Sequence, residues 1–533
     1  MFTIHTDINP AFQIRSNAER HPDRMILTFE SPDQPDHVMA YQELVSKGNR
    51  LAAVLKSSGI GPGDTFAVMM NNQPEIVLAL YAALATGSLL VPLDPGCGWE
   101  KLVYFLRNSD AKGVIFSPDK SGNPQKALSV QPNIKILGIK KQDDLDTDLS
   151  GMGPDLSDIL NDSTGKRVEP SRKPSAKHAM ILYTSGTSGI PKGIRIRTAD
   201  LYNFLFLAAN VFQYTSDDCL YTGLPMTHGN AYSITIVPSI ALGIPAVISR
   251  SFDKKRVWDI CRQYKCTSFS LMGSLIEDVY REPERPHDAV HPVKKIITAG
   301  TPKHIWQKFE RRFNVAIHEW YGTLEGGFAH KPPGRGPVGS IGKPIEKHME
   351  VKVVHEDHTQ CTPGKTGELL YRFKDRKTVV EYQQGPVVSP ETSADGWIRS
   401  NDMVHQDHDG WLFFDYRKGQ NLRNQGEFIS PLEVESVFLT HPDVREACAY
   451  GIETPSGSPG DLEVVVAITP RNKTTPDINE IFAFSSKRLP SRAMPAYIQL
   501  VESIPRTVSE KVIHRLLKEG FNTESPNVYS FKI

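Results

Sequence analysis

The sequence predicts an α/β protein with a large N-terminal domain of several subdomains, built on mostly parallel sheets and containing a β-rich subdomain, followed by a small α+β C-terminal domain. The chain of 533 residues is too long for a single hydrophobic core. Strand-like and helix-like segments alternate through its first part, which is typical of parallel sheets covered by helices. After about residue 345 short β-type runs take over, and helix and strand alternate again beyond the polar segment 416–420. We therefore expect an N-terminal domain at 1–417 and a C-terminal domain at 418–533.

The first alternating elements can be predicted one by one. Residues Tyr41–Leu55 carry apolar side chains at helical spacing, and a cluster of glycines separates them from the strand-like run Thr65–Met70. Asn72 is a candidate N-cap, with Pro74 just inside the next helix, where a missing N–H costs nothing. Small, polar and proline residues interrupt the apolar stretch Ile76–Leu93, which favours a buried helix leading into a buried strand over a membrane span.

Later elements follow from the same patterns. A polar stretch, Asp143–Lys177, predicts a surface excursion, and the strand-like run Ala179–Tyr183 comes directly after it. Short β-type runs at Met349–Val354 and Gly367–Arg372 are separated by turn residues. A helix is expected at Pro431–Phe438.

Composition excludes several classes of protein. Lys plus Arg number 61 and Asp plus Glu number 61, so no overall charge favours nucleic acid or an anionic membrane surface. The six cysteines form no CxxC pair, which favours reduced thiols over a zinc site or a disulfide framework. The N-terminus lacks a basic segment followed by an apolar one, so we expect no secretory signal and a cytoplasmic location.

The segment Tyr183–Gly193 carries the strongest chemical signal. Its glycines allow tight turns that bring N–H groups to an anion, while four hydroxyl side chains and Lys192 add donors and charge. A Walker A loop has Gly before its Lys and Ser or Thr after it, whereas here Pro191 precedes the lysine and Gly193 follows. The segment thus predicts a different kind of phosphate-binding loop. Its expected nucleotide-binding residues are Thr184, Ser185, Gly186, Thr187, Ser188 and Gly189.

This loop resembles the signature of the adenylate-forming superfamily, which comprises acyl-CoA synthetases, peptide-synthetase adenylation domains and firefly luciferases. Further segments resemble the other motifs of the superfamily in their expected order, so the resemblance spans about Tyr41 to Lys511. These segments are Leu224-Pro-Met-Thr-His-Gly-Asn230, Ala299-Gly-Thr-Pro302, Tyr321-Gly-Thr-Leu-Glu325, Ser400-Asn-Asp402, Asp415-Tyr-Arg417 and Pro505-Arg-Thr-Val-Ser-Glu-Lys511. The order of the motifs behind the phosphate loop carries the assignment, because each of them is weak alone.

The resemblance implies ATP and coenzyme A as co-substrates, Mg²⁺ as the metal, and a role for each matched residue. For the adenine base, it implies a turn at Gly300 and Thr301 and a stacking aromatic ring at Tyr321, which is followed by Gly322 and Thr323. For the ribose, it implies Asp402 as a hydrogen-bond acceptor. Arg417 would contact both the ribose and the phosphate. For the acyl group, it implies a pocket beside His228 and Asn230. For the metal, it implies Glu325 and Thr184.

The resemblance also implies catalysis with domain rotation. Lys192, Glu325 and a mobile Lys511 would stabilise the charge of the transition state. The C-terminal domain would rotate about a hinge at Gly419 and bring its loop to the arm of coenzyme A. The loop residues expected there are Gln425, Gly426 and Glu427.

Four positions depart from the superfamily pattern. Leu324 replaces a phosphate-contacting Thr, a role that the neighbouring Thr323 could supply. Asn401 replaces the Gly before Asp402, and the two remaining departures are Glu510 in place of Gly and Gly419 in place of Asp or Lys. These changes bear on rates and metal geometry more than on the class of reaction.

Two other patterns are interpreted as turns and loops. Gly334–Gly339 matches a dinucleotide-binding fingerprint, but two prolines precede it where a strand is required. The pairs His355/His358 and His405/His408 lie in polar segments without a matching cluster of ligands, which favours hairpin turns over a metal site.

The sequence thus predicts an ATP-dependent carboxylic acid:CoA ligase that forms acyl-AMP and then acyl-CoA. The alternatives are an adenylation enzyme that loads a carrier protein, although no carrier unit follows Lys511 in this sequence, a luminescent oxidative enzyme, and a non-catalytic nucleotide-binding homologue. Within the CoA ligases, Arg423–Pro431 and Pro225–Ala231 look most like the carnitine/crotonobetaine-CoA ligase branch. We expect a small carboxylic acid as substrate and neither nucleic acid nor a membrane span; the identity of the acid and the oligomeric state stay open.

Overall fold

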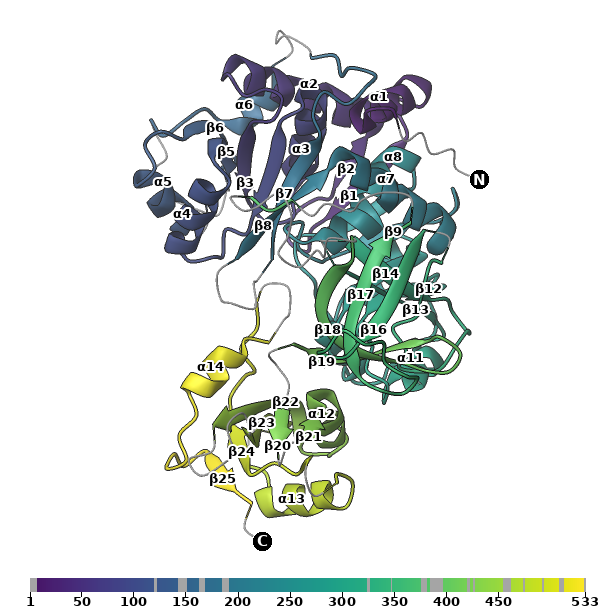
Figure 1. Cartoon of the computed structure of the whole chain (residues 1–533). Helices are drawn as coiled ribbons and strands as arrows, with labels where there is room; N and C mark the ends of the chain where they lie inside the picture. The colour runs from purple at the N-terminus through teal and green to yellow at the C-terminus, as the bar shows by residue number, and fades with distance from the viewer. Residues whose placement is uncertain are drawn as a thin grey trace.

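The computed structural model describes most of the chain, and the structural statements below concern the residues it describes. They are residues 7–118, 122–141, 151–162, 168–184, 191–323, 326–346, 348–374, 381–383, 396–418, 422–424, 427–453, 462–472, 475–490, 493–507 and 512–531. Two large sheets lie beside each other in the N-terminal part, an antiparallel sheet adjoins them, and a smaller C-terminal part is set apart (Figure 1). The predicted α/β architecture, with a large N-terminal and a small C-terminal domain, is confirmed.

The first sheet has the strand order β6-β5-β3-β4-β7-β8, and only β8 runs antiparallel to its neighbour. Its strands are β3 (Thr65–Met69), β4 (Leu89–Leu93), β5 (Ala111–Phe116), β6 (Lys135–Ile139), β7 (His178–Thr184) and β8 (Lys192–Arg197). The helices of this part are α2 (Tyr41–Ser57), α3 (Pro74–Thr86), α4 (Trp99–Asn108), α5 (Asn123–Ser129) and α6 (Leu156–Asn161). Along β3, Phe66 and Val68 join the core that contains α3, whereas Ala67 and Met69 join the core that contains α4. The strand is therefore apolar throughout, as expected for a sheet covered on both faces.

The second sheet has nine strands in the order β15-β14-β13-β12-β11-β9-β10-β1-β2. Its six central strands are parallel, and β2, β14 and β15 are antiparallel strands at its two edges. The strands are β1 (Met25–Glu30), β2 (His37–Ala40), β9 (Leu220–Thr222), β10 (Ala246–Ser249), β11 (Ser268–Met272), β12 (Lys295–Ala299), β13 (Ala316–Thr323), β14 (Gly326–Lys331) and β15 (Lys343–Pro344). The helices are α1 (Pro10–Arg20), α7 (Thr198–Phe206), α8 (Val237–Leu242), α9 (Val257–Gln263), α10 (Ser274–Tyr280) and α11 (Trp306–Phe313), with π-helical segments η1 (Leu207–Val211) and η2 (Ala231–Ile236).

The β-rich subdomain predicted after residue 345 is an antiparallel sheet in the order β16-β17-β18-β19. Its strands are β16 (Met349–Val354), β17 (Gly367–Phe373), β18 (Ile398–Gln406) and β19 (Leu412–Arg417). The segment 355–358 forms the turn after β16, where the N–H of His355 donates to Thr359 O at 2.9 Å. His405 lies within β18, next to its last residue, and its ring bonds Asp415 at 2.9 Å. The first histidine pair and His408 therefore lie in turns as predicted, whereas His405 lies in a strand of the hairpin.

The C-terminal part has its own sheet and core. The sheet has the order β22-β23-β24-β25, with one parallel pair between β23 and β24. Its strands are β22 (Val444–Glu453), β23 (Leu462–Pro470), β24 (Tyr497–Leu500) and β25 (Val528–Ser530), and a hairpin of β20 (Leu422–Asn424) and β21 (Glu427–Ile429) precedes it. The helices are α12 (Pro431–Leu439), α13 (Ile478–Ser486) and α14 (His514–Glu519). Figure 1 shows this part, in green and yellow, below the N-terminal sheets.

Most element predictions agree with the structure within one or two residues, and two differ. Asn72 is not the N-cap of α3; Gln73 occupies that position without a side-chain cap bond, and Asn72 bonds other loops instead. The polar excursion contains the helix α6, whose Leu156 is fully buried against Gly138. Six residues were too short a window for the helical spacing of α6 to stand out in a polar background.

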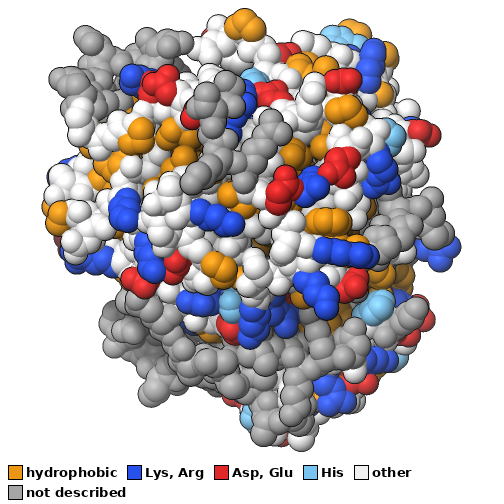
Figure 2. All heavy atoms as spheres, turned by 90° about the horizontal axis from the view of Figure 1, so that it is seen from above, with side chains coloured by type: hydrophobic (Ala, Val, Ile, Leu, Met, Phe, Trp, Pro, Cys, Tyr) orange, Lys and Arg blue, Asp and Glu red, His pale blue; other side chains and the backbone are white. Residues whose placement is uncertain are grey.

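The described surface agrees with the balanced charge of the sequence. Lys and Arg side chains are interspersed with Asp and Glu side chains over the face shown in Figure 2. All six cysteines are free thiols. Among the described residues, no helix has the length and apolar character of a membrane span, and no group of three or more His, Cys, Asp or Glu could hold a metal ion.

A backbone seam joins the nine-stranded sheet to the β-rich subdomain. The N–H of Leu412 donates to Gly342 O at 3.0 Å, and the N–H of Ile341 donates back to Leu412 O at 2.9 Å. Gly342 has φ of +107°, and a Cβ there would lie 2.2 Å from the carbonyl carbon of His330. Only glycine combines this dihedral with this approach of two backbones.

We predict that Gly342→Ala lowers the free energy of unfolding by at least about 2 kcal/mol more than Gly364→Ala does. Gly364 also has a positive φ, of +81°, but a Cβ there would meet nothing within 4 Å, so its substitution costs only the dihedral strain of about 1–2 kcal/mol. Urea unfolding of both variants measures the difference. Equal losses of unfolding free energy in the two variants would show that the seam accommodates a Cβ at Gly342 without additional cost.

Candidate active site

Segments that follow parallel strands of both large sheets come together at the carboxyl ends of those strands. A cleft of about 270 Å³ opens there. Its lining comes from the segments that follow β3, β4, β9, β10 and β11, and it comprises residues 70–72, 94, 223–228, 250–252, 272 and 275. Ligands of open parallel sheets bind at such carboxyl edges, because several loops converge there. The phosphate loop leaves the carboxyl end of β7, the neighbour of β4 in the first sheet.

Several predicted site residues lie outside the described part of the chain, so their roles stay predictions. They are Ser185, Gly186, Thr187, Ser188, Gly189, Glu325, Gly419, Gln425, Gly426 and Lys511, together with the side chains of Thr184 and Glu427. Leu324 and Glu510, two of the departures from the superfamily pattern, lie outside it as well.

The two ends of the phosphate loop are held side by side. Thr184 pairs with Lys192 across the antiparallel strands β7 and β8, so the loop begins and ends at the same point. The hydroxyl of Tyr104 donates to Pro191 O at 2.7 Å and fixes the exit of the loop from α4. A Cβ on Gly193 would lie 3.0 Å from the ring of Tyr183, which explains why glycine follows the lysine.

Lys192 itself starts β8 and is exposed. Its Nζ lies 5.6 Å from the ring centroid of Tyr382. Residues 381–383 continue the sheet beyond β8, since the N–H of Gln383 donates to Gly193 O at 2.8 Å. The lysine is therefore carried on a strand that is hydrogen-bonded on both sides, at the mouth of the loop.

A buried carboxylate organises the predicted adenine-side turn. Glu319 on β13 is 1% exposed and accepts from the N–H of Gly300 at 2.5 Å, from Thr298 Oγ1 at 2.7 Å and from Thr301 Oγ1 at 2.6 Å. Gly300 has φ of +87°, which lets the chain turn back on itself directly after β12. Burial raises the pKa of Glu319, and its bonds to Thr301, Thr298 and the turn N–H groups oppose that rise.

Glu319 was not among the residues predicted from the sequence. One feature of the sequence could have identified it: an acidic residue follows the apolar run Val315–Ile317. Charged residues are rare in strands that are buried on both faces. A buried carboxylate in such a place needs several donors, and a turn with free N–H groups supplies them.

Tyr321, Asp402 and Arg417 form one cluster across two sheets. The Tyr321 hydroxyl on β13 donates to Asp402 Oδ2 on β18 at 2.5 Å. Arg417, which pairs with Asp402 across β18 and β19, holds its Nε 3.7 Å from Asp402 Oδ1. Burial and the neighbouring carboxylate raise the pKa of Tyr321. Asp402 is 4% exposed, and Arg417 Nε is buried and has no hydrogen-bond partner among the residues that the structure describes.

The structure explains one departure from the superfamily pattern. Asn401, at the position of the usual glycine, has φ of +59°. Asparagine is the residue after glycine that most readily adopts this left-handed conformation, so the replacement preserves the local backbone. The N–H of Lys418 donates to Asn401 O at 2.8 Å across the sheet.

The loop that carries His228 is fixed by Asn72. Asn72 Nδ2 donates to Leu224 O at 2.9 Å and to Ser249 O at 3.0 Å, and its Oδ1 accepts from the N–H of Met226 at 2.8 Å. One buried side chain therefore binds the loop after β9 to the end of β10 and to the start of α3. His228 lines the cleft, and its Nδ1 accepts from the N–H of Asn230 at 3.2 Å.

Asn230 lies behind His228 and is 3% exposed. Its Oδ1 accepts from Ser270 Oγ on β11 at 2.8 Å. The loop after β9 and the strand β11 are thus bonded to each other beneath the cleft, as expected for two elements that both line it.

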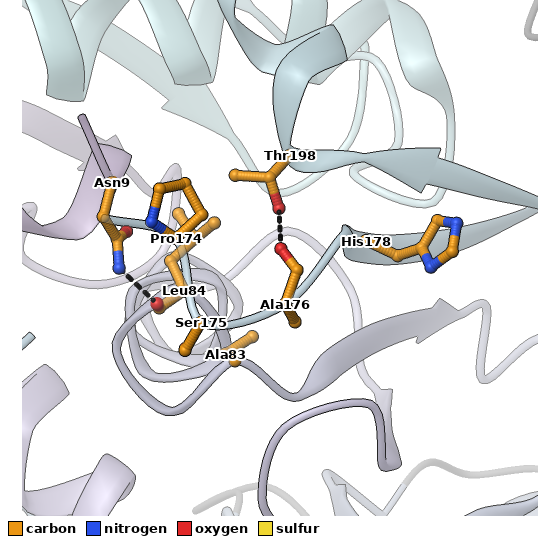
Figure 3. Close-up of a pocket in the computed structure, with 9 residues that line it drawn as sticks. Asn9, Ala83, Leu84, Pro174, Ser175, Ala176, His178 and Thr198 are labelled. Atoms are coloured by element: carbon orange, nitrogen blue, oxygen red, sulfur yellow. Dashed lines mark hydrogen bonds between the residues drawn. The ribbon is translucent and has the colours of Figure 1, made fainter. Parts of the chain in front are cut away.

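A second, much smaller cavity has a structural role. It holds about 10 Å³, room for one water molecule at most, between α1, α3 and the segment before β7. Asn9 Nδ2 donates there to Leu84 O at 3.1 Å, and Thr198 Oγ1 donates to Ala176 O at 3.2 Å (Figure 3). The first bond joins the N-cap of α1 to α3, and the second joins the start of α7 to the segment before β7. The cavity is too small for a substrate.

Comparison with protein families identifies two matching regions. The profile of the family described as AMP-binding enzyme matches residues 14–374, and that of the AMP-binding enzyme C-terminal domain matches residues 433–511. Among curated proteins, the chain is 25% identical over 518 residues to the oxalate--CoA ligase of Arabidopsis thaliana, covering 95% of this chain and 97% of the relative. It is also 25% identical over 514 residues to the 2-succinylbenzoate--CoA ligase of Bacillus licheniformis, covering 95% and 98%.

Solved structures with the same fold include two CoA ligases. A benzoate CoA ligase from Burkholderia xenovorans superposes with a TM-score of 0.81 at 20% identity, covering 96% of this chain and 99% of that one. The o-succinylbenzoate CoA synthetase of Bacillus subtilis in complex with its acyl-adenylate gives a TM-score of 0.78 at 22% identity, covering 97% and 99%. These likenesses confirm the fold over nearly the whole chain.

We predict that Glu319→Ala lowers the free energy of unfolding by about 3 kcal/mol or more, because it leaves several buried donors of the turn without an acceptor. Glu310→Ala is the matched control, since Glu310 accepts a single backbone bond, from Ile317 at 3.0 Å, and should cost about 1 kcal/mol. Urea unfolding gives both values. Similar losses in the two variants would mean that the turn does not depend on the buried carboxylate.

Proposed function

Because the chain belongs to the AMP-binding enzyme family, we propose that it is an ATP-dependent carboxylic acid:CoA ligase, which forms acyl-AMP and pyrophosphate and then acyl-CoA and AMP. The observation that carries this proposal is the arrangement of the described site. The turn at Gly300 follows β12 and Tyr321 lies near the end of β13, in the same sheet as β9, β10 and β11, whose carboxyl ends line the cleft beside His228. Tyr321 also bonds Asp402 of the β-rich subdomain. A nucleotide and an acid bound at these places would meet next to the phosphate loop.

The first step joins the acid to AMP. A carboxylate oxygen attacks the α-phosphorus of ATP, the new C–O–P bond forms, and the bond from the α-phosphorus to the bridging oxygen breaks as pyrophosphate leaves. Negative charge builds on the phosphate oxygens, and Lys192 and Lys511 would stabilise it. Glu325 and Thr184 would hold Mg²⁺, which when bound neutralises charge on the phosphates.

The second step transfers the acyl group to sulfur. The thiol sulfur of coenzyme A attacks the acyl carbon, the thiol proton passes to solvent, and the carbon–oxygen bond breaks so that AMP leaves with an oxygen of the acid. The mixed anhydride makes this possible, because AMP is a good leaving group whereas the oxygen of a free carboxylate is not.

The described residues fit a nucleotide. Asp402 accepts from the Tyr321 hydroxyl through Oδ2, and its carboxylate could also accept from a ribose hydroxyl. Arg417 Nε, 3.7 Å from Asp402 Oδ1 and without a hydrogen-bond partner among the described residues, could donate to the ribose or to the α-phosphate. The hydroxyl bond also holds the Tyr321 ring in place, so that its face can stack on the adenine beside Gly300, with Gly322 and Thr323 next to it.

We place the boundary between the two domains at residues 417 and 418, with the hinge at Gly419. Lys418, the last described residue before this hinge, is still bonded to the β-rich sheet, through its N–H to Asn401 O and through Nζ to Glu368 at 3.3 Å. A hydrogen bond from Ser430 Oγ to Asp415 O joins the C-terminal part to the β-rich sheet. At 3.3 Å it is long, and it is partly exposed, which is expected of a contact that breaks when the domain rotates. Rotation would withdraw Lys511 and bring Gln425, Gly426 and Glu427 to the thiol arm.

The acid is expected to lie beside His228 and Asn230, and the enzyme to act in the cytoplasm. The likeness of two short loops to the carnitine/crotonobetaine-CoA ligase branch stays a prediction, and so does coenzyme A rather than a carrier protein as the acceptor. The same assay with a carrier protein in place of coenzyme A distinguishes the two acceptors.

The test of the proposed function is acid-dependent release of pyrophosphate. A panel of carboxylic acids with ATP and Mg²⁺ should include acids that raise pyrophosphate release well above the rate without acid, and coenzyme A should then yield thioester and AMP. ATP binding without release on any acid would identify a non-catalytic nucleotide-binding homologue.

We further predict that Lys511→Ala lowers acid-dependent pyrophosphate release by a factor of about 10² to 10³, because it removes one charge-stabilising contact of the transition state. The same variant should form thioester from synthetic acyl-AMP and coenzyme A at nearly the parental rate. Lys518→Ala, at a lysine of α14 in the same domain, is the matched control and should leave both steps unchanged. Equal losses in both half-reactions of Lys511→Ala would contradict domain alternation.

A further inference from the structure

A buried side chain two residues after the cleft-lining His228 has a hydrogen-bond donor with no partner among the described residues. This side chain is Asn230, which is 3% exposed and whose carbonyl oxygen accepts from Ser270 Oγ at 2.8 Å. The atom without a partner in that part of the chain is its buried Nδ2. Since the carbonyl oxygen is the atom bonded to Ser270, the amide plane is fixed and the NH₂ group faces the other way.

A buried hydrogen-bond donor without a partner costs folding free energy, so its presence in a protein points to a role other than stability. A buried amide without an acceptor typically costs about 1–3 kcal/mol, and most buried polar atoms in folded proteins are bonded. The neighbouring Asn72 shows the usual outcome, because its side-chain oxygen and nitrogen are both bonded to backbone groups. Asn230 differs from Asn72 in that its side-chain nitrogen has no hydrogen-bond partner among the described residues.

The position of Asn230 follows from the residues that line the cleft. His228 and Met272 both line it. Asn230 follows His228 by two residues, and Ser270 precedes Met272 by two on β11, on the same face of the strand. Two residues along a strand span about 7 Å, so Ser270, with the Asn230 amide bonded to it, lies about that far along β11 from the cleft-lining Met272.

The local backbone supports a ligand-binding role. Asn230 directly precedes η2, a π-helical segment whose residues are all buried. π-helical segments are rare and occur frequently at functional sites, since the wider turn moves side chains out of their α-helical positions.

We propose that Asn230 Nδ2 is a specificity-determining donor that selects carboxylic acids bearing a neutral oxygen acceptor on their chain, namely hydroxy or oxo acids. This inference rests on the proposed function and names the substrate class of that site. The acid's carboxylate reacts near the nucleotide residues, and its chain points down past His228, where the substituent oxygen accepts from Asn230.

Neutral oxygen suits this donor better than a second carboxylate. The carboxamide is uncharged, and a buried carboxylate needs a charged partner or several donors to offset its desolvation. Glu319 in this protein illustrates the requirement, with four hydrogen-bonding groups gathered around one buried carboxylate. One amide group is enough for a hydroxyl or a carbonyl oxygen.

The test compares matched pairs of acids in the full chain. Straight-chain acids of equal length, with and without one hydroxyl or oxo group, are assayed for pyrophosphate release, and dicarboxylic acids form a third arm. The parental protein should favour the best oxygenated acid over its hydrocarbon counterpart by about 10- to 100-fold in kcat/KM, because the hydrocarbon leaves the donor unpaired. Asn230→Leu, which is nearly isosteric and apolar, should reduce this ratio to within about threefold.

Two further variants separate selection from a structural role. Ser270→Ala removes the hydroxyl that fixes the Asn230 amide, so the amide can rotate. This variant should therefore partially lower the ratio of kcat/KM for the oxygenated acid to that for its hydrocarbon counterpart. Ser239→Ala removes a buried hydroxyl on α8 that bonds Ile26 O at 3.2 Å, away from the cleft, and should lower stability without changing the ratio. A parental ratio near one, a preference for dicarboxylic acids, or equal losses on both acids in Asn230→Leu would overturn the inference. Absence of acid-dependent release from the parental protein would instead refute the proposed function.

Discussion

The hydrogen bond between Tyr321 and Asp402 is the contact on which the predicted nucleotide site depends. It is 2.5 Å long, it is partly buried, and it joins β13 of the nine-stranded sheet to β18 of the β-rich subdomain. One sheet supplies the ring and the other supplies the carboxylate, so this pair forms only where the two sheets meet. The backbone seam at Gly342 fixes the same two sheets beside each other, so their relative position is set by two independent contacts. A short bond between an aromatic hydroxyl and a carboxylate is strong in a buried setting, and it orients both groups at once.

Buried polar side chains account for the rest of the site's geometry. Glu319 and Asn72 are fully bonded to backbone and hydroxyl groups, and each holds a loop that no secondary structure would hold by itself. Arg417 Nε and Asn230 Nδ2, by contrast, are buried without hydrogen-bond partners in the part of the chain that the structure describes. Arg417 belongs to the cluster with Tyr321 and Asp402, and Asn230 follows the cleft-lining His228 by two residues. This division is what a site assembled in advance for its substrates requires, because groups that bind substrate have no partner until substrate arrives.

Much of the fold could be predicted from the sequence, because periodicity and turn residues report local structure. The helix α2, the strands β3 and β4, and the antiparallel β16 and β17 all follow from such patterns. The side-chain role of Asn72 was predicted wrongly, since capping is a local rule and the true partners, Leu224 and Ser249, lie far away in the sequence. Glu319 was missed for the same reason, because the groups that it bonds, at Gly300 and Thr301, also lie far from it in the sequence. Motif order identified Tyr321 and Asp402 as site residues, but only the fold brings them into contact.

The central claim is that the acid is activated by its own attack on the α-phosphate of ATP. Isotope transfer tests this most directly: the acid is labelled with ¹⁸O in both carboxylate oxygens, the full reaction with ATP, Mg²⁺ and coenzyme A is run, and the phosphate products are analysed by mass. The proposed mechanism predicts one ¹⁸O in each AMP formed and none in pyrophosphate, because the acid's oxygen stays on the α-phosphorus when the thiol takes the acyl group. Label in orthophosphate, with ADP as the nucleotide product, or AMP that carries no label, would contradict an acyl-adenylate intermediate.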